Sequence, residues 1–325
     1  MCFGGVRERI EPDPKPFADY SAQVQFINVD RVRWSISSFK PHKAAGPDGI
    51  KPVVLQNCGP NFLNRLTNFY KASVILGYVP TSLCDSKVIF IPKTGKDEYS
   101  IPKSFRPISL TCTIFKVLER VLLNELELNT FTAHPICERQ HAFRKGSSCD
   151  SALSDMVDNI EKSILRGEYA VGLFLDIAGA FDNVRMASAN NAMYKSHFPP
   201  LIRAWYLNYL LNRTASAELR GYRVDALLER GTPQGGVLSP ILWNITFDDF
   251  LELFKMGPVR ALGYADDGSL VICGQDPKTL TAILQRALDR VLVWGQEAGL
   301  TFSEVKTEVV VFTHKQGGSL GFPPP

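Results

Sequence analysis

An apolar run that ends in a carboxylate constrains the fold of this chain more than any other feature. Residues 170–177 read AVGLFLDI, and their length and composition predict a buried strand. Asp176 is costly in such a strand unless it is paired or binds a metal ion. Further along, residues 261–273 read ALGYADDGSLVIC, which predicts two short strands joined over an Asp-Gly turn. We therefore expect Asp176 to lie beside Asp266 and Asp267.

The order of the other elements predicts an α+β fold whose main sheet is antiparallel and backed by helices. Further helices are expected over residues 29–40, 55–76, 111–128, 151–165 and 239–254, and further strands over 87–92, 218–224, 227–230 and 308–313. Ser239 is expected as an N-cap, with Pro240 at the first helical position. Asp276 should cap a last helix, which Gly299 ends.

Composition excludes several classes of protein. Apolar residues make up 45% and charged residues 21% of the 325 residues, which excludes disordered and fibrous chains. The net charge of +3 is too small to indicate a nucleic-acid partner. It divides unevenly, with 20 basic and 14 acidic residues in 1–150 and 16 and 19 in 151–325. This division suits an anion-binding surface beside a carboxylate site, and random scatter explains it equally well.

The seven cysteines are odd in number, dispersed and never spaced as C-x-x-C. They argue against a disulfide framework or a zinc cluster and predict a reducing, intracellular location, in the nucleus or the cytoplasm. No apolar run approaches the length of a membrane span, so we expect no membrane association.

The carboxylates allow two interpretations. Taken alone, the acidic pair is explained by a turn in which Asp267 and Gly268 reverse the chain and Asp266 faces water. Taken together with Asp176, the pair suits phosphoryl transfer from a nucleotide, which needs positioning and charge neutralisation more than covalent help. Two Mg²⁺ ions, held by carboxylates and substrate phosphates, supply both.

Several segments carry a resemblance to a known family. FLDIAGAFDNV (174–184), RGTPQGGVLSPILWN (230–244) and GYADDGSLVI (263–272) resemble, in this order and spacing, the core of reverse transcriptases. Other segments are similar to those of non-LTR (LINE-type) retrotransposon polymerases. These are HKAAGPDGI (42–50), KVIFIPKTGKD and FRPISLTCTIFKVLERVL (within 87–122), and QHAFRKGSSCDSAL (140–153).

The resemblance implies the fingers and palm of a right-hand polymerase, with the palm an antiparallel sheet backed by helices. On this basis residues 1–28 are assigned to a lead-in, 29–167 mainly to the fingers, 168–316 mainly to the palm and 317–325 to a tail. A thumb is expected to be missing or truncated. No room is expected for the endonuclease that LINE-type elements carry before the polymerase.

The resemblance also implies which residues carry the chemistry. Asp176, Asp266 and Asp267 would be the catalytic carboxylates, with Asp176 and Asp266 the more direct ligands of two Mg²⁺ ions, or of Mn²⁺ in vitro. The backbone carbonyl of Ile177 would complete one metal site. Phe181 would pack under the incoming sugar and exclude a 2′-hydroxyl, although core packing is the more common role of a Phe.

Further residues are assigned to the nucleotide by the same resemblance. Gln234 and Gly235 would line the nucleotide pocket. Arg106 and Lys93 would contact the triphosphate, where an Arg can bind in bidentate fashion. Lys306 would lie near the leaving pyrophosphate as a candidate general acid.

Two other acids receive structural roles. Asp182 is expected to support a helix N-terminus, and Glu119 to be structural or to contact the template backbone. The stretch 87–116 holds six basic and two acidic residues with interleaved Phe, which suits a single-stranded template. A solvated loop rich in lysine is the ordinary alternative.

The expected function is therefore that of a retrotransposon RNA-directed DNA polymerase. It would add dNTPs to a primer 3′-hydroxyl, with an RNA template and a DNA primer or nicked DNA target as partners. Two alternatives stay open. One is a truncated, non-catalytic remnant that still binds nucleic acid, and the other is an RNA-dependent RNA polymerase, which Phe181 disfavours.

Overall fold

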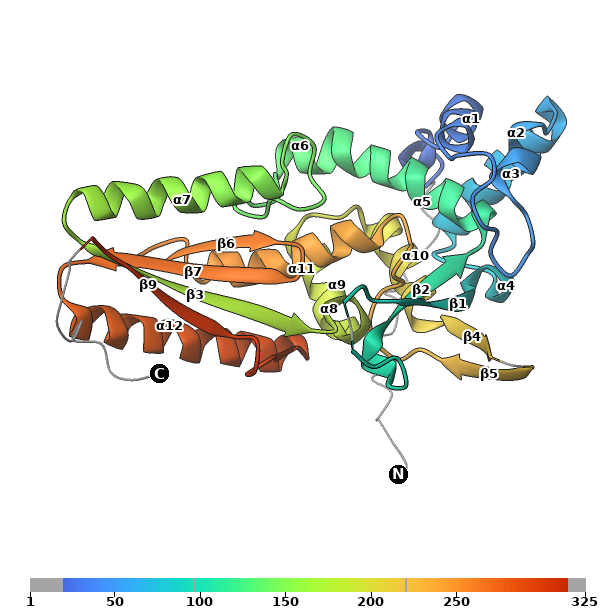
Figure 1. Cartoon of the computed structure of the whole chain (residues 1–325). Coiled ribbons are helices and arrows are strands. Elements are labelled where there is room, and N and C mark those ends of the chain that lie inside the picture. The colour runs from blue at the N-terminus through green and yellow to red at the C-terminus, as the bar shows by residue number, and fades with distance from the viewer. Residues whose placement is uncertain (1–19, 96, 220, 315–325) are drawn as a thin grey trace.

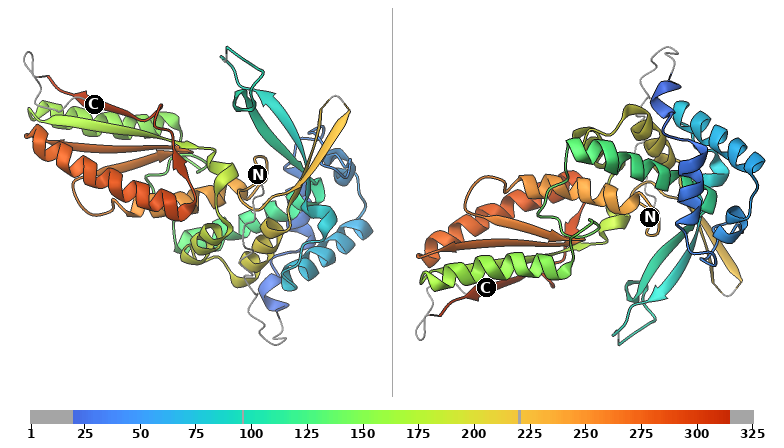
Figure 2. Two further views of the ribbon diagram at one scale, coloured as in Figure 1. Left: turned by 90° about the horizontal axis from the view of Figure 1, so that it is seen from below. Right: turned by 90° about the horizontal axis from the view of Figure 1, so that it is seen from above.

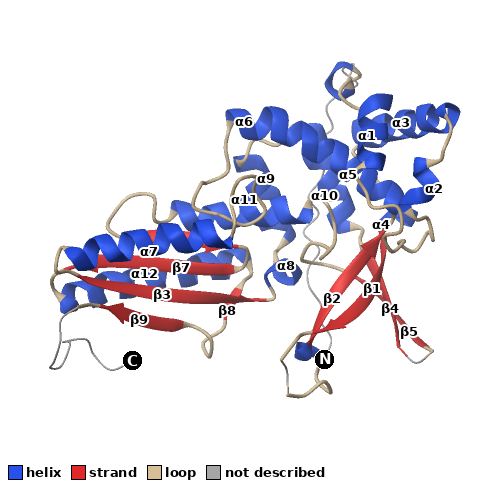
Figure 3. Ribbon diagram, turned by 45° about the horizontal axis from the view of Figure 1, so that its top comes forward, coloured by secondary structure: helices blue, strands red, loops and turns tan. Residues whose placement is uncertain are grey.

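The computed structural model describes residues 20–95, 97–219 and 221–314. Its strands form two sheets at opposite ends of the molecule, with helices packed around and between them (Figures 1 and 3). This mixture of helices and mainly antiparallel strands confirms the expected α+β class. In the described part of the chain no helix is long and apolar enough to span a membrane.

The elements have the following bounds. The helices are η1 (Ala22–Val24), α1 (Val29–Ser37), α2 (Pro52–Gln56), α3 (Pro60–Ile75), α4 (Thr81–Cys84), η2 (Pro102–Ser104), α5 (Thr113–Glu125), η3 (Leu126–Thr130), α6 (Phe131–Ala133), α7 (Cys149–Leu165), α8 (Ala180–Asn183), α9 (Met186–Lys195), α10 (Pro200–Leu211), α11 (Ser239–Glu252) and α12 (Pro277–Ala298). The strands are β1 (Asp85–Pro92), β2 (Phe105–Thr111), β3 (Tyr169–Ala178), β4 (Thr214–Leu219), β5 (Tyr222–Leu227), β6 (Arg260–Tyr264), β7 (Asp267–Gly274), β8 (Thr301–Phe302) and β9 (Glu308–Phe312).

The larger sheet carries Asp176. Its strands follow the order β6-β7-β3-β8, and β9 also pairs with β3. Successive residues of a strand point to opposite faces, and both faces are covered. Val271 of β7 packs with Ile160 of α7, whereas Leu270 and Ile272 belong to the main core shared with α11 and α12. Figure 1 shows β3 and β7 between α7 and α12, so the strand that bears Asp176 is held by packing on both sides.

The smaller sheet joins segments that lie far apart in the sequence. Its order is β2-β1-β4-β5, and β1 runs parallel to β4 with Asp85 opposite Thr214. The antiparallel pair β1–β2 and the antiparallel pair β4–β5 meet at one end and diverge at the other (Figure 2). Strands β4 and β5 thus belong to the smaller sheet, although their residues fall in the range assigned to the palm. Helix α7 falls in the range assigned to the fingers, yet it packs on the larger sheet. A single boundary at residue 168 does not separate the two sheets.

Three expected elements are wrong in detail. The helix expected over 55–76 is divided into α2 and α3, because Gly59 is extended and Pro60 starts a new helix. Proline lacks the N–H that would continue a preceding helix. The strands expected over 218–224 and 227–230 are replaced by the β4–β5 hairpin, in which Gly221 adopts φ +83° at the turn.

Helix α11 begins one position earlier than expected. Leu238 is the N-cap, so Ser239 is the first helical residue and Pro240 the second. The Ser239 side chain does not cap the backbone. Its Oγ accepts a hydrogen bond from Thr232 Oγ1 at 2.8 Å, which ties the helix to the Gly-rich turn before it, residues 232–236 (TPQGG).

Other ends agree with the sequence. Asp276 caps α12, and Gly299 ends it in the left-handed conformation. Residues 20–28 had been assigned to the lead-in, yet Val24 and Ile27 are fully buried in the main core. The rest of the lead-in, 1–19, and the expected tail, 317–325, lie outside the described residues.

Candidate active site

The three acids predicted to act together lie at one end of the larger sheet. Asp176 of β3 stands opposite Asp267, the first residue of β7, and cross-strand partners carry their Cβ atoms about 5 Å apart on one face. Asp266 precedes Asp267 in the hairpin turn. Asp267, rather than Asp266, is therefore the strand neighbour of Asp176. The backbone of Ile177 pairs with Phe302 of β8.

The turn of this hairpin differs from the expected Asp-Gly turn. Its two residues are Ala265 and Asp266, and Gly268 lies inside β7. Ala265 has φ +54°, in the left-handed region that is costly for a residue with a Cβ atom. Contacts from the surrounding structure must hold this turn.

Negative charge is concentrated at the three acids. Burial raises the pKa of Asp267, and the neighbouring carboxylates of Asp266 and Asp176 raise it further, while Lys306 lowers it. The Lys306 ammonium group lies 3.0 Å from both carboxylate oxygens of Asp176. Lys306 therefore offsets part of the negative charge of the three carboxylates, and the negative charge that remains can attract a cation.

The donor set fits a hard divalent ion such as Mg²⁺ or Mn²⁺, which prefers carboxylate oxygens. Among the residues that the structure describes, no three His, Cys, Asp or Glu side chains form a group that could hold an ion by themselves. Mg²⁺ at nucleotide sites is commonly held by one or two carboxylates together with substrate phosphates and water. The site therefore fits a metal that the carboxylates bind with water in the absence of nucleotide and that substrate phosphates bind further.

Phe181 lies in an aromatic cluster next to these acids. It is half-buried in α8, where its ring stacks on Trp243 of α11 at 5.8 Å between centroids. Phe143 meets it edge-on at 6.1 Å. The ring is thus supported from two sides, as a residue that excludes a substrate group by its bulk must be.

Gln234 is oriented by an acid for which the sequence suggested another role. Its Nε2 donates a hydrogen bond to Asp182 Oδ2 at 3.0 Å. Burial raises the pKa of Asp182, whereas the Gln234 hydrogen bond and the nearby charges of Arg213 and Lys93 lower it. The only sequence signal for this partnership was that both residues lie in the motifs that carry the resemblance.

Gly235 is explained by a close approach of two backbones. It has φ +124°, and a Cβ atom at this position would lie 2.7 Å from the carbonyl oxygen of Ser109 in β2. Ser109 N in turn donates to the carbonyl of Gln234 at 2.8 Å. The glycine therefore lets the Gly-rich turn pack on the smaller sheet.

Glu119 fixes the other end of the same turn. This fully buried carboxylate accepts hydrogen bonds from Val237 N at 3.1 Å and Leu238 N at 3.2 Å. Burial raises its pKa to about 7, although these bonds and nearby Lys116 lower it. The signal that sequence reasoning missed is the position of this acid on the apolar face of an amphipathic helix.

The residues predicted to contact the triphosphate lie on the smaller sheet. Arg106 is exposed on β2, opposite Ile91 of β1. Lys93 follows β1, and its Nζ donates to the carbonyl of Lys103 at 2.9 Å. No described contact joins either residue directly to Asp176, so their assignment to the triphosphate stays a prediction.

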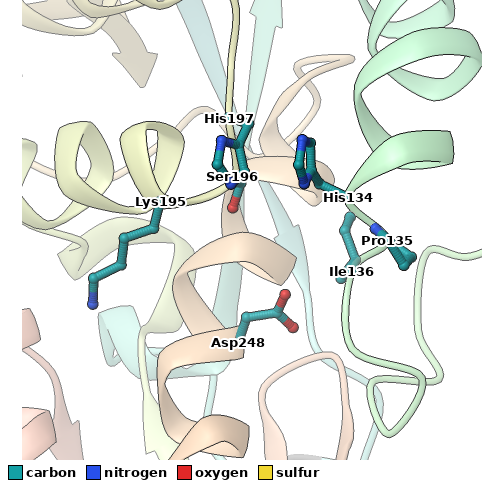
Figure 4. A pocket seen from close by; sticks show the side chains of 7 residues that line it. All are labelled: His134, Pro135, Ile136, Lys195, Ser196, His197 and Asp248. Atoms are coloured by element: carbon teal, nitrogen blue, oxygen red, sulfur yellow. The ribbon is translucent and has the colours of Figure 1, made fainter.

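A separate pocket contains none of the predicted site residues. It is lined by His134, Pro135, Ile136, Lys195, Ser196, His197 and Asp248, from the segment after α6, the end of α9 and helix α11 (Figure 4). The rings of His134 and His197 stack at 3.8 Å between centroids. Stacked rings do not aim their nitrogens at a common ion, so this pocket does not replace the acids as the candidate site.

Comparison with known proteins identifies the family. Residues 91–323 match the model of the family described as reverse transcriptase (RNA-dependent DNA polymerase). The chain belongs to the reverse transcriptase family. Members of this family use divalent metal ions and copy RNA, and the resemblance drawn from the motifs is confirmed.

Similar reverse transcriptases come from mobile elements. The chain is 27% identical to the RNA-directed DNA polymerase from mobile element jockey of Drosophila melanogaster, over 97% of this chain and 34% of that protein. It is 25% identical to the Pol polyprotein from type-1 retrotransposable element R1 of Bradysia coprophila, over 88% of this chain and 28% of that protein. The chain spans about a third of the length of these relatives.

Solved structures share the fold of this reverse transcriptase. Telomerase from Candida tropicalis, in complex with a fragment of telomeric RNA, aligns with a TM-score of 0.53 and 13% identity over 77% of this chain and 45% of that one. Telomerase from Candida albicans aligns with a TM-score of 0.53 and 14% identity over 80% and 47%. At this identity the likeness concerns the fold, and it confirms the expected fingers-and-palm architecture.

Proposed function

We propose that this chain is the polymerase part of a non-LTR retrotransposon protein and adds dNTPs to a primer 3′-hydroxyl on an RNA template. The observation that carries the proposal is the register that sets Asp176 opposite Asp267, with Asp266 in the adjoining turn. The similarity to polymerases of jockey and R1 elements supports the retrotransposon origin.

The chemistry follows from charge. The primer 3′-hydroxyl gives up its proton to solvent water as its oxygen attacks the α-phosphorus of the nucleotide, and pyrophosphate leaves. Two Mg²⁺ ions, or Mn²⁺ in vitro, supply neutralisation of the attacking and leaving oxygens when bound. Asp176, Asp266 and Asp267 would hold them, with the carbonyl of Ile177 as a further ligand. Lys306, at the same end of the sheet, would donate a proton toward the leaving pyrophosphate.

The nucleotide would lie between the two sheets. Phe181 would exclude a 2′-hydroxyl by its bulk, with Gln234 and Gly235 beside the sugar and base. Arg106 and Lys93, on the smaller sheet, would attract the triphosphate. RNA template and DNA primer, or a nicked DNA target, would be the partners.

Primer extension tests the proposal. On poly(rA)/oligo(dT) with Mg²⁺ and dTTP, the chain should incorporate nucleotide, and Asp266→Asn or Asp176→Asn should lower the rate by at least about 100-fold. Asp158→Asn is a matched control, since Asp158 is an exposed acid of α7 paired with Lys162. Equal rates for wild type and D266N would contradict the metal assignment.

The same assay separates the alternatives. Template-primer binding by the wild type without any incorporation would select the non-catalytic remnant, for which the relatives give no support. Incorporation of rNTPs in preference to dNTPs would select an RNA polymerase instead.

A further inference from the structure

The carbonyl oxygen of Ala265 accepts two side-chain hydrogen bonds. Trp243 Nε1 of α11 donates to it at 2.7 Å, and Gln140 Nε2 donates to it at 3.3 Å. Ala265 is the left-handed residue of the hairpin turn and immediately precedes Asp266. Two donors from distant parts of the chain therefore meet at the one strained residue beside the candidate carboxylates.

Gln140 is itself fixed before it reaches the turn. Its side chain is fully buried, and its Oε1 accepts a hydrogen bond from Ala142 N at 3.2 Å. Its backbone runs beside β6 as a short bridge to Gly263. On either side of it, His141 N donates to the Gly263 carbonyl at 2.9 Å, and Gly263 N donates to the Arg139 carbonyl at 2.8 Å. The amide group of Gln140 is thus held in register with the hairpin.

Trp243 is in contact with two functional elements at once. It is fully buried. Its indole N–H holds the turn, and its ring face stacks on Phe181. A displacement of this one side chain would therefore disturb both the acidic turn and the residue expected to exclude a 2′-hydroxyl.

We propose that Trp243 and Gln140 are positioning residues that clamp the Ala265 carbonyl and so hold Asp266 and Asp267 toward Asp176 for cation binding. The inference rests on the proposed function for its cation. A left-handed Ala persists only where its surroundings over-determine the conformation, and these two donors are the contacts that do so. Without them the turn would relax, and the two acids would move relative to β3.

A matched pair of variants tests the clamp. Trp243→Phe keeps a ring for Phe181 to stack on but loses the N–H. Trp205→Phe removes an equivalent buried N–H, which donates to Ser73 Oγ at 2.9 Å in another part of the core. Mn²⁺ binding to the full chain is measured by EPR titration, and hydrogen exchange is followed in the peptide covering 262–270. Neither readout requires polymerase activity.

The expected result is a Mn²⁺ dissociation constant about three- to tenfold higher in W243F, with faster exchange over 262–270, which is the effect of losing one hydrogen bond. W205F should change neither. Gln140→Met should act in the same direction as W243F. Adding Ala265→Gly to W243F should restore part of the affinity, since glycine adopts the left-handed conformation without cost.

The outcomes separate the two proposals. If the Asp266→Asn variant binds Mn²⁺ as tightly as the wild type, the proposed metal assignment fails. The hydrogen-exchange experiment alone then tests whether Trp243 and Gln140 hold the turn. If D266N weakens Mn²⁺ binding but W243F matches wild type in both affinity and exchange, the clamp is wrong. Equal effects of W243F and W205F on the 262–270 peptide would also overturn it.

Discussion

The ammonium group of Lys306 lies 3.0 Å from each carboxylate oxygen of Asp176. The two residues are brought together by the turn after β8, where Ser303 N donates to the Asp176 carbonyl at 2.9 Å. Lys306 therefore takes up the oxygens that a cation would use. It partly neutralises the acid and competes with a metal for it.

This competition predicts that Lys306→Met tightens Mn²⁺ binding while it slows nucleotide incorporation. Lys306 is exposed and Asp176 is half-buried, so solvent screens the pair and the gain in affinity should be small, roughly two- to fivefold. EPR titration measures the affinity, and single-turnover extension measures the rate. Lys162→Met, which removes a lysine that pairs with Asp158 on α7, is the control. Weaker Mn²⁺ binding in K306M would show that Lys306 supports the site rather than competes with the ion.

Shortening Phe181 should relax the choice of sugar. In Phe181→Val the space under the sugar opens, and the ratio of rNTP to dNTP incorporation should rise roughly tenfold or more. Phe131→Leu, the control, removes a ring that meets Phe198 edge-on at 6.0 Å in another part of the core, so its ratio should match wild type. An unchanged ratio in F181V would return Phe181 to plain core packing.

Asp182 should act through Gln234. Asp182→Ala removes the acceptor of the Gln234 side-chain hydrogen bond, and the KM for dNTP should rise roughly three- to tenfold with a smaller change in kcat. Asp182→Asn keeps an oxygen acceptor and should recover most of the loss. Steady-state kinetics at saturating template-primer provides the comparison. A D182A variant with normal KM would leave the Gln234 contact without a role in nucleotide binding.

Glu119 should make stability depend on pH. Its folded-state pKa is raised to about 7 from an ordinary 4.5, mainly by burial. The folded state therefore binds this proton more tightly than the unfolded state. The stability that this proton adds to the folded state is fully present below about pH 4.5 and is lost as the pH rises through 7. The free energy of unfolding should fall by an amount on the order of 3 kcal/mol over this range.

Urea unfolding between pH 5 and 8 measures this dependence. Glu119→Gln cannot titrate, so its unfolding free energy should fall less with pH than that of wild type. At low pH, E119Q should be the less stable chain, because its amide accepts only one of the two backbone hydrogen bonds. Parallel pH profiles for the two chains would show that Glu119 is not the titrating group.

The sequence predicted the elements with strong periodicity and could not predict contacts made by single side chains. The apolar run over 170–177 correctly predicted β3, because a strand buried on both faces is apolar throughout, and Asp276 and Gly299 correctly predicted the two ends of α12. The hairpin turn was misplaced, because Asp-Gly is a good local turn and the contacts that hold Ala265 come from Gln140 and Trp243, distant in the chain. Tertiary contacts override local turn preference here.

The candidate site shows the same division. The order of the predicted strand and hairpin placed Asp176, Asp266 and Asp267 close together, and in the structure they lie at one end of the larger sheet. The hydrogen bonds of Asp182 and Glu119 could not be foreseen, because an acid in a motif or on a helix does not reveal its partner. For Lys93 and Arg106, the structure gives a place on the smaller sheet, and a role in binding the triphosphate stays a prediction.

The parallel pairing of β1 with β4 has a consequence during synthesis. Thr214 follows Asp85 by 129 residues, so at a typical 5–20 residues per second the ribosome needs on the order of 10 s to deliver the partner strand. Until then the edge of β1 is unpaired, with Ile89, Phe90 and Ile91 at the surface even in the finished fold. Asp176 is therefore synthesised while this edge of β1 is still open, and Asp266 and Asp267 follow only after β4 can pair with it.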